Sequence, residues 1–170
     1  YKDKSKGYDL IDGHDISRLF DEKYPIIRFT ENPKNHIPDI GSMVYTVWDN
    51  DDKFIYVGIS GVGQSSNTPL EKRNPVSRMI SHRSGRRSGD QFCIYVHDFF
   101  VIPELIKRGI FEPSHGLLDR LTKQYIHENL SYRFCCFQTE DSNKIVRKIE
   151  TEIINGYFGL KPFFNSKSSK

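Results

Sequence analysis

Residues 43–59 read MVYTVWDNDDKFIYVGI and contain the strongest fold signal in the chain. Two runs rich in β-branched and aromatic residues, Met43–Trp48 and Phe54–Ile59, flank the polar cluster Asp49–Asp52. Apolar runs of this length and composition on either side of a turn-forming cluster are typical of paired antiparallel strands. The sequence therefore predicts a β-hairpin over residues 43–59.

This hairpin places two tyrosines on one face of the predicted sheet. If the four polar residues form the loop, counting back along both strands pairs Tyr45 with Tyr56. The same register pairs Met43 with Gly58, which has no side chain. We therefore expect open space beside the two tyrosines.

The region before the hairpin gives a weaker signal. Residues 1–40 mix charged with isolated apolar residues and contain three prolines, which indicates an irregular or weakly helical extension. Only residues 9–23 are predicted to form a short helix. We therefore expect two parts, the extension over 1–40 and one domain over 41–170, and the initial Tyr1 suggests numbering that starts inside a longer gene product.

Two helices with clear boundaries are predicted after the hairpin. The first begins at Asn74-Pro75 and ends near Gly85, which places Arg78 and His82 one turn apart. The second runs from Asp141-Ser142 to Gly156. On the second helix three residues share an apolar face and Glu150 borders it; the three are Val146, Ile149 and Ile153.

The remaining segments complete an α+β fold class. Residues 92–96 and 132–137 are predicted as strands, and residues 101–130 as a helical insertion with Ser114 as a cap. The insertion carries an apolar stripe at four-residue spacing, made of Leu117, Leu121 and Tyr125. We expect a small central antiparallel sheet of about three strands, flanked by helices.

Composition excludes several classes of protein. The 170 residues are 36% hydrophobic and 28% charged, which suits one folded domain rather than a disordered chain. No apolar run approaches the roughly 18 residues that span a bilayer, so we expect no membrane contact. Three cysteines do not form a disulfide framework, which favours a reducing, cytoplasmic setting. The net charge of +3 is compatible with a nucleic-acid partner without requiring one.

Five side chains stand out, although each has an ordinary interpretation. Tyr45 and Tyr56 are of a type common in strands, and Arg78 with His82 would usually form a solvated helix face. A carboxylate such as Glu150 at the edge of an apolar stripe often reaches solvent. Taken one by one, these residues leave both the functional and the ordinary structural interpretation open.

The order of these residues resembles the GIY-YIG endonuclease superfamily, in its restriction-enzyme branch. Met43-Val44-Tyr45 stands where that family has its first motif, and Tyr56-Val57-Gly58 matches the second. Arg78-x-x-x-His82 follows on the next helix, and the segment around Glu150 looks like the family's metal-binding glutamate. Pro162-x-x-Asn165 looks like its closing element. The first motif departs from the family in carrying Met43 and Val44 instead of Gly and Ile.

The resemblance implies a role for each side chain. Tyr45 would take the proton from the attacking water, and His82 would relieve that tyrosine of its proton. Arg78 would bind the phosphate that is cut, and Tyr56 would bind the same phosphate or help to orient the water. Asn165 would be a positioning residue. Glu150 would hold one Mg²⁺, with Mn²⁺ as a substitute, and Glu152 is the alternative ligand.

The partner implied by the resemblance is double-stranded DNA. A strip of basic residues beside the site is predicted to contact its phosphates and consists of Lys72, Arg73, Arg83, Arg86 and Arg87. The expected function is metal-dependent DNA cleavage in restriction or genome defence. The alternatives are a catalytically inactive DNA-binding or regulatory module and a fragment of a homing or repair nuclease. A homodimer formed through the stripe of the insertion is a separate expectation.

Overall fold

The computed structural model describes residues 10–165, and these form an α+β fold around one antiparallel sheet. The sheet has four strands in the order β3-β6-β4-β5. Their bounds are Ile27–Arg28 (β3), Ser42–Asp49 (β4), Phe54–Ser60 (β5) and Leu130–Phe137 (β6). The α+β class is confirmed, whereas the expected three strands become four because β3 comes from the region before the hairpin.

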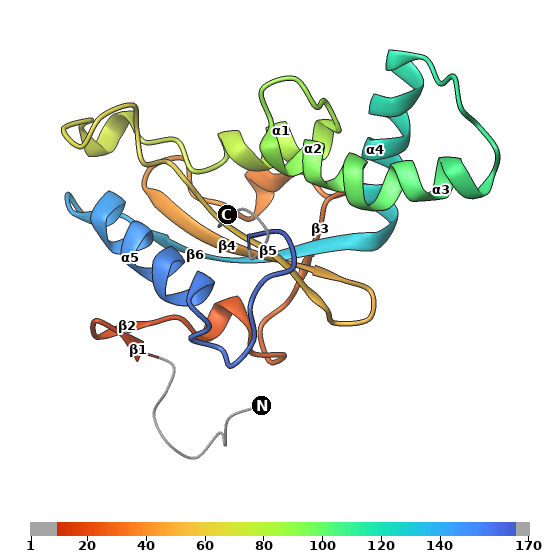
Figure 1. Cartoon of the computed structure of the whole chain (residues 1–170). Helices are drawn as coiled ribbons and strands as arrows, with labels where there is room; N and C mark the ends of the chain where they lie inside the picture. Colours follow the sequence, from red (N-terminus) through yellow and green to blue (C-terminus); the bar gives the residue numbers. More distant parts are fainter. Residues whose placement is uncertain (1–9, 166–170) are drawn as a thin grey trace.

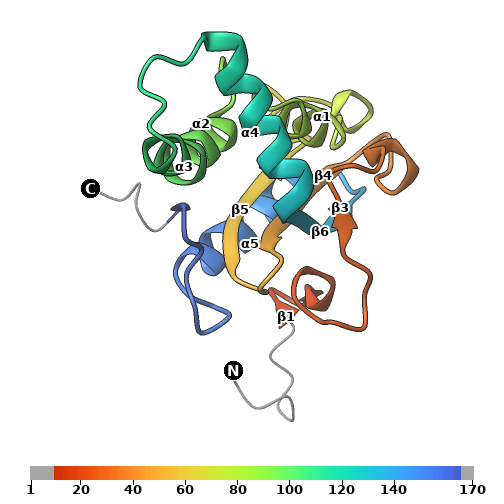
Figure 2. The ribbon, with the colours of Figure 1, turned by 90° about the vertical axis from the view of Figure 1, so that its right-hand side faces the viewer.

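Helices cover both faces of this sheet (Figure 1, Figure 2). Four lie on one face, namely α1 (Ser77–Ser84), α2 (Gln91–Val96), α3 (Ile102–Lys107) and α4 (His115–Asn129). A π-helical turn over His97–Val101 joins α2 to α3. The opposite face is covered by α5 (Ser142–Ile154). Each face therefore has its own apolar core, one around Tyr45 and Met79 and one around Val57 and Ile149.

The hairpin forms where it was predicted, but its register differs by two residues. Tyr45 pairs with Gly58, and Val47 pairs with Tyr56. One residue of the shift comes from a shorter loop, in which Asp52 adopts φ of 58° and the amide of Asp49 donates to the carbonyl of Lys53. A β-bulge beside Val47 adds the other residue. A shift of two keeps both tyrosines on one face, because side chains alternate with a period of two.

The helix predicted from residue 75 is confirmed. It starts a little later, at Ser77, after the Asn74 side chain accepts a hydrogen bond from the amide of Val76. It ends at Gly85, whose φ of 71° belongs to the left-handed region that favours glycine. The sequence predicts both boundaries of this helix because the residues that start and stop it act locally, without tertiary contacts.

The predicted strand over residues 92–96 is wrong, since this segment is helix α2. Asp90 caps the helix, because its side chain accepts a hydrogen bond from the amide of Cys93 at 3.1 Å. A short apolar run has no periodicity that separates a strand from a buried helix. The cap decides the conformation here.

The predicted helix over residues 9–23 is also wrong over its described part, and residue 9 lies outside the described residues. Two short strands, β1 (Leu10–Ile11) and β2 (His14–Asp15), pair as a separate two-stranded sheet. A single 3₁₀ turn follows at Ser17–Leu19. Further along, β3 pairs with β6 in the main sheet, so the region before the hairpin is built into the fold.

The insertion and the last helix follow their predicted patterns. Helix α4 begins after Ser114, whose hydroxyl accepts a hydrogen bond from the amide of Leu117, and it packs on β6 and α1. On α5 the three predicted apolar residues are buried; they are Val146, Ile149 and Ile153. The cysteines are free thiols. No helix among residues 10–165 has the length and apolar character needed to cross a membrane.

Candidate active site

Three buried side chains from separate elements form a continuous hydrogen-bonded chain. Tyr45 lies in β4, His82 in the last turn of α1, and Asp90 at the start of α2. The Tyr45 hydroxyl lies 2.7 Å from Nε2 of His82, and Nδ1 of His82 lies 2.7 Å from Oδ2 of Asp90. Each of the three residues is 1% exposed. We refer to this set as the relay.

The direction of the hydrogen bonds follows from the protonation of Asp90. Burial alone would raise the pKa of Asp90, but hydrogen bonds from His82, Ser81 and the amide of Cys93 outweigh burial and lower the pKa to about 2. The ionised carboxylate only accepts, so Nδ1 of His82 carries a proton. Burial lowers the pKa of His82, which keeps the ring neutral, and Nε2 therefore accepts from the Tyr45 hydroxyl.

Tyr45 is protonated in the resting protein and has a proton acceptor in contact. Burial raises the pKa of Tyr45 well above its ordinary value, and the negative charges of Asp90 and Glu150 add to the rise. Departure of the phenolic proton therefore depends on transfer to His82 rather than to solvent. The sequence interpretation of His82 as the neighbour of Tyr45 is supported by this contact.

Gly58 provides the room for the Tyr45 side chain. It is the residue directly opposite Tyr45 in the hairpin, and a Cβ atom at this position would collide with the Tyr45 hydroxyl. The expected open space beside the tyrosines is thus filled by the phenol of Tyr45. Any larger residue at position 58 would displace the first member of the relay.

Tyr56 lies next to the relay. Its ring centroid is 6.2 Å from that of Tyr45 and 6.3 Å from that of His82. Burial raises the pKa of Tyr56 to about 12, and the negative charge of Glu150 is the next cause. The side chain is half-buried, so it stays a neutral hydrogen-bonding group within reach of the surface.

The charge of Glu150 acts on the two tyrosines from the other side of the sheet. Glu150 belongs to α5, which covers the face opposite to α1, but β5 is an edge strand (Figure 1). The charge of Glu150 raises the pKa of both Tyr56 and Tyr45. Glu152, the alternative ligand, is exposed.

Glu150 offers a single carboxylate to a cation. The side chain is half-buried and has no hydrogen bond or ion pair among residues 10–165. Burial raises its pKa to about 7, and Arg147 offsets only part of the rise. A bound divalent cation would favour the ionised form, and Mg²⁺ needs few protein ligands because it keeps most of its waters. In the part of the chain that the structure describes, no group of three or more His, Cys, Asp or Glu side chains could hold a metal.

Arg78 supplies positive charge at the mouth of the site. It lies one turn before His82 on α1, is exposed, and has no ion pair within residues 10–165. Its charge opposes the rise in the pKa of both Tyr45 and Tyr56. Of the two residues predicted one turn apart, Arg78 therefore faces solvent and His82 is buried.

Asn165 holds the edge strand. Its side-chain oxygen accepts from the amide of Val57 at 2.9 Å, and its side-chain nitrogen donates to the carbonyl of Val57 at 3.0 Å. The preceding residues continue this pairing, since the amide of Phe164 donates to the carbonyl of Ile55. Asn165 is thus a positioning residue for the strand that carries Tyr56.

The five basic residues predicted as a DNA-contacting strip do not form one surface. Arg73 is 3% exposed and donates to the carbonyls of Thr68, Thr139 and Glu140. The prediction that it contacts DNA is corrected, because its donors are used inside the protein.

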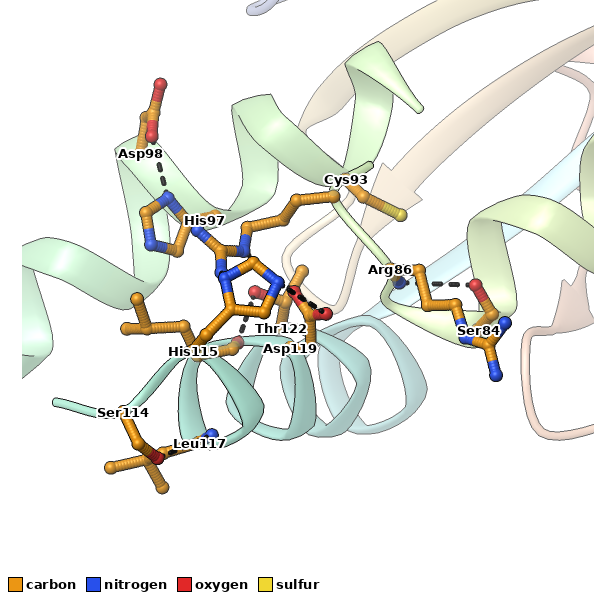
Figure 3. A network of polar contacts seen from close by, with 12 residues as sticks. Ser84, Arg86, Cys93, His97, Asp98, Ser114, His115, Leu117, Asp119 and Thr122 are labelled. Carbon is orange, nitrogen blue, oxygen red and sulfur yellow. Dashed lines mark hydrogen bonds and ion pairs between the residues drawn. The ribbon is translucent and has the colours of Figure 1, made fainter. Parts of the chain in front are cut away.

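Two of the other basic residues are also engaged within the protein. Arg83 donates to the carbonyls of Phe29 and Thr30, and Arg87 pairs with Asp119 at 2.8 Å. Figure 3 shows Asp119 beside His115, and Arg86 beside Ser84. Only Lys72 and Arg86 of the original five remain as exposed cations.

Asp90 was missed by reasoning from the sequence. It stands eight residues after His82 across a Gly- and Arg-rich turn, a spacing that no helical or strand period connects. One local signal was present, since an Asp before an apolar run is typical of a helix N-cap. That signal identifies α2 but does not bring Asp90 to His82.

Comparisons of the chain with models of known protein families, with curated proteins and with solved structures found no match.

Proposed function

We propose that the chain is a Mg²⁺-dependent endonuclease of the GIY-YIG type that hydrolyses phosphodiester bonds in double-stranded DNA. The observation that carries the proposal is the relay from Tyr45 through His82 to Asp90 beside Tyr56. Such an arrangement is suited to removing a proton from a weak acid in a site of low polarity.

The relay accounts for how a phenol with a raised pKa can act as a base. The Tyr45 oxygen accepts a proton from the attacking water while its own proton passes to Nε2 of His82 over 2.7 Å. The ionised Asp90 stabilises the imidazolium that forms, through the hydrogen bond from Nδ1. No phenolate needs to exist in the buried site.

Three groups would serve the phosphate, namely Arg78, Tyr56 and a divalent cation. Arg78 offers parallel donors to the phosphoryl oxygens, and its guanidinium stays charged at any physiological pH. Tyr56 donates its hydroxyl to the same group or to the attacking water. A divalent cation held by Glu150 would stabilise charge on the phosphoryl oxygens and on the departing 3′ oxygen.

The biological setting that we propose is restriction or another form of genome defence. The expected homodimer fits cleavage of both strands at a symmetric site. Apolar side chains are exposed around α3 and the loop after it, including Ile106 and Phe111. Sedimentation of the protein with and without DNA tests this expectation, and a monomer under both conditions would contradict it.

The activity is tested on unmethylated supercoiled plasmid with Mg²⁺. We compare the unmodified chain with Glu150→Gln and with the matched control Glu152→Gln. The unmodified chain and the control should cut at similar rates, and Glu150→Gln should cut at least about a hundredfold more slowly. Equal cutting by Glu150→Gln would contradict the metal assignment. Salt-dependent DNA binding without cleavage under any divalent cation would support the inactive binding module instead.

A further inference from the structure

A pocket of about 410 Å³ opens beside the candidate active site. It lies between the loop that follows β5 and the start of α1. Arg78 and Ser81 line it from the helix, and Ser60, Gln64 and Lys72 line it from β5 and the loop. Ser81 donates to Asp90, so the pocket adjoins the relay.

The charge of the pocket favours an anion. Lys72 and Arg78 are exposed, and neither side chain forms an ion pair or hydrogen bond among residues 10–165. No acidic side chain lines the pocket. Two uncompensated cations in one concave surface attract phosphate groups.

Ser60 adds a donor that has nothing to bind within the protein. Its side chain is 3% exposed, and its hydroxyl has no hydrogen-bond partner in the described part of the chain. The neighbouring hydroxyls differ, because Ser77 donates to the carbonyl of Asn74 and Ser81 donates to Asp90. A buried hydroxyl without a partner destabilises the folded state, and a ligand would offset this by accepting its hydrogen bond.

We propose that this pocket binds a phosphodiester of the DNA strand being cut, next to the scissile phosphate, through Lys72 and the Ser60 hydroxyl. This inference rests on the proposed function, in which Arg78 binds the scissile phosphate. Because Arg78 borders both places, a strand that crosses it brings a neighbouring phosphate over the pocket. The pocket is open rather than enclosed, as a continuous strand requires.

The first test measures DNA binding by fluorescence anisotropy, with a short duplex and EDTA to prevent cleavage. We compare the unmodified chain with Lys72→Ala, Ser60→Ala and the control Lys107→Ala, whose residue is exposed on α3 at the other end of the molecule (Figure 1). Lys72→Ala should reduce the slope of log affinity against log salt by about 1. Ser60→Ala should weaken binding about tenfold, and the control should do neither.

A thermal unfolding measurement without DNA separates binding from folding. Ser60→Ala should leave the melting temperature unchanged or raise it, because the change removes an unpartnered buried hydroxyl. A lower melting temperature together with unchanged DNA affinity would overturn the proposal, since Ser60 would then be structural. An unchanged salt slope for Lys72→Ala would overturn it as well.

Uncharged methylphosphonates placed one at a time along the duplex locate the contact. One position near the cleavage site should weaken binding by the unmodified chain but not weaken Lys72→Ala further. If no position has this effect, while inorganic phosphate raises the melting temperature of the unmodified chain and not of Ser60→Ala, the pocket takes free phosphate and the DNA assignment is overturned. Cleavage is absent from all three tests, so they stand apart from the plasmid assay of the proposed function.

Discussion

Two of the His–Asp pairs among residues 10–165 have the same hydrogen-bond distance and different surroundings. Nδ1 of His82 lies 2.7 Å from Asp90, and Nδ1 of His97 lies 2.7 Å from Asp98. Nε2 of His82 accepts from Tyr45, whereas Nε2 of His97 is buried without a partner among residues 10–165. Figure 3 shows the second pair on its helical segment. The two pairs therefore differ in their third partner, which is a tyrosine hydroxyl for His82 and absent among the described residues for His97.

The two carboxylates differ as much as the two imidazoles. The Asp90 side chain is 1% exposed and its pKa is lowered to about 2, whereas the Asp98 side chain is 54% exposed. A buried charge interacts strongly with its partner because the medium is less polar than water. The second pair is therefore a natural internal control for the first.

The largest expected effect is that of Tyr45→Phe, which removes the third partner. Loss of the phenolic oxygen should reduce plasmid cleavage about a thousandfold, because the water then has no base. The free energy of unfolding should fall by about 1–3 kcal/mol, since Nε2 of His82 loses its donor in a buried site. Cleavage rates and denaturant titrations measure these two effects.

Tyr132→Phe is the matched control for that variant. Tyr132 is also buried in the sheet, but its hydroxyl has no partner within the described chain. Its removal should leave cleavage unchanged and the stability within about 1 kcal/mol of the unmodified protein. Equal effects of the two changes would remove the distinction between the relay and ordinary packing.

The next effect in size is that of Asp90→Asn compared with Asp98→Asn. Oδ1 of Asp90 caps α2 by accepting from the amide of Cys93, so an asparagine that keeps this bond places its NH₂ group toward His82. Nδ1 must then accept, the proton moves to Nε2, and the ring can no longer take the proton of Tyr45. Cleavage at neutral pH should fall about a hundredfold for Asp90→Asn and stay unchanged for Asp98→Asn.

A pH profile distinguishes this role from a structural one. The deficit of Asp90→Asn should narrow as the pH rises, because hydroxide increasingly replaces the water that needs the relay. A variant that is merely less folded would keep the same deficit at every pH. A constant ratio of rates between pH 7 and pH 9 would therefore contradict the positioning role of Asp90.

The smallest effect concerns Glu150, a carboxylate that its surroundings push toward the neutral form. Its pKa is raised to about 7 from an ordinary value of 4.5, so the native state binds more protons than the unfolded state between these values. The unfolding free energy should then fall by on the order of 2 kcal/mol as the pH rises from about 4.5 through 7. Glu150→Gln should lack this fall, as equilibrium unfolding at several pH values would show.

Addition of Mg²⁺ sharpens the same measurement. At pH 8 the cation should stabilise the unmodified protein, because it binds the ionised carboxylate of the native state, and it should leave Glu150→Gln unaffected. Equal stabilisation of both proteins would show that the cation binds elsewhere. Stabilisation of the unmodified protein alone would also distinguish Glu150 from Asp90, the other acidic group of the site, because Asp90 stays ionised throughout this pH range.

Local sequence signals identified most of the elements that carry the candidate site. The strands with Tyr45 and Tyr56, the helix with Arg78 and His82, and α5 with Glu150 were all predicted. Strand composition, the Asn-Pro start and the Gly end act over a few residues, so their effect is visible without the rest of the chain. The approach of Tyr45 to His82 was also predicted, but from the family resemblance rather than from these signals.

The register and the basic residues show where local signals fail. The pairing of Tyr45 with Gly58 depends on a bulge and on the left-handed conformation of Asp52, and each of these shifts the register by one residue. The role of Arg73 depends on carbonyls some 70 positions further along the chain. Composition does not predict which of several hydrogen bonds a backbone group will make. It also does not predict which distant acceptors a side chain will reach.

By itself the sequence determined the α+β class, the hairpin, the boundaries of α1 and α5, and which polar residues lie on them. Only the tertiary structure decided that Asp90 completes the relay, that Glu150 acts on the tyrosines around an edge strand, and that three of the five basic residues bind inside the protein. The physical reason is the separation along the chain of the residues that interact. Caps and periodicity are properties of neighbouring residues, whereas pKa shifts and buried hydrogen bonds depend on groups that the fold brings together from distant positions.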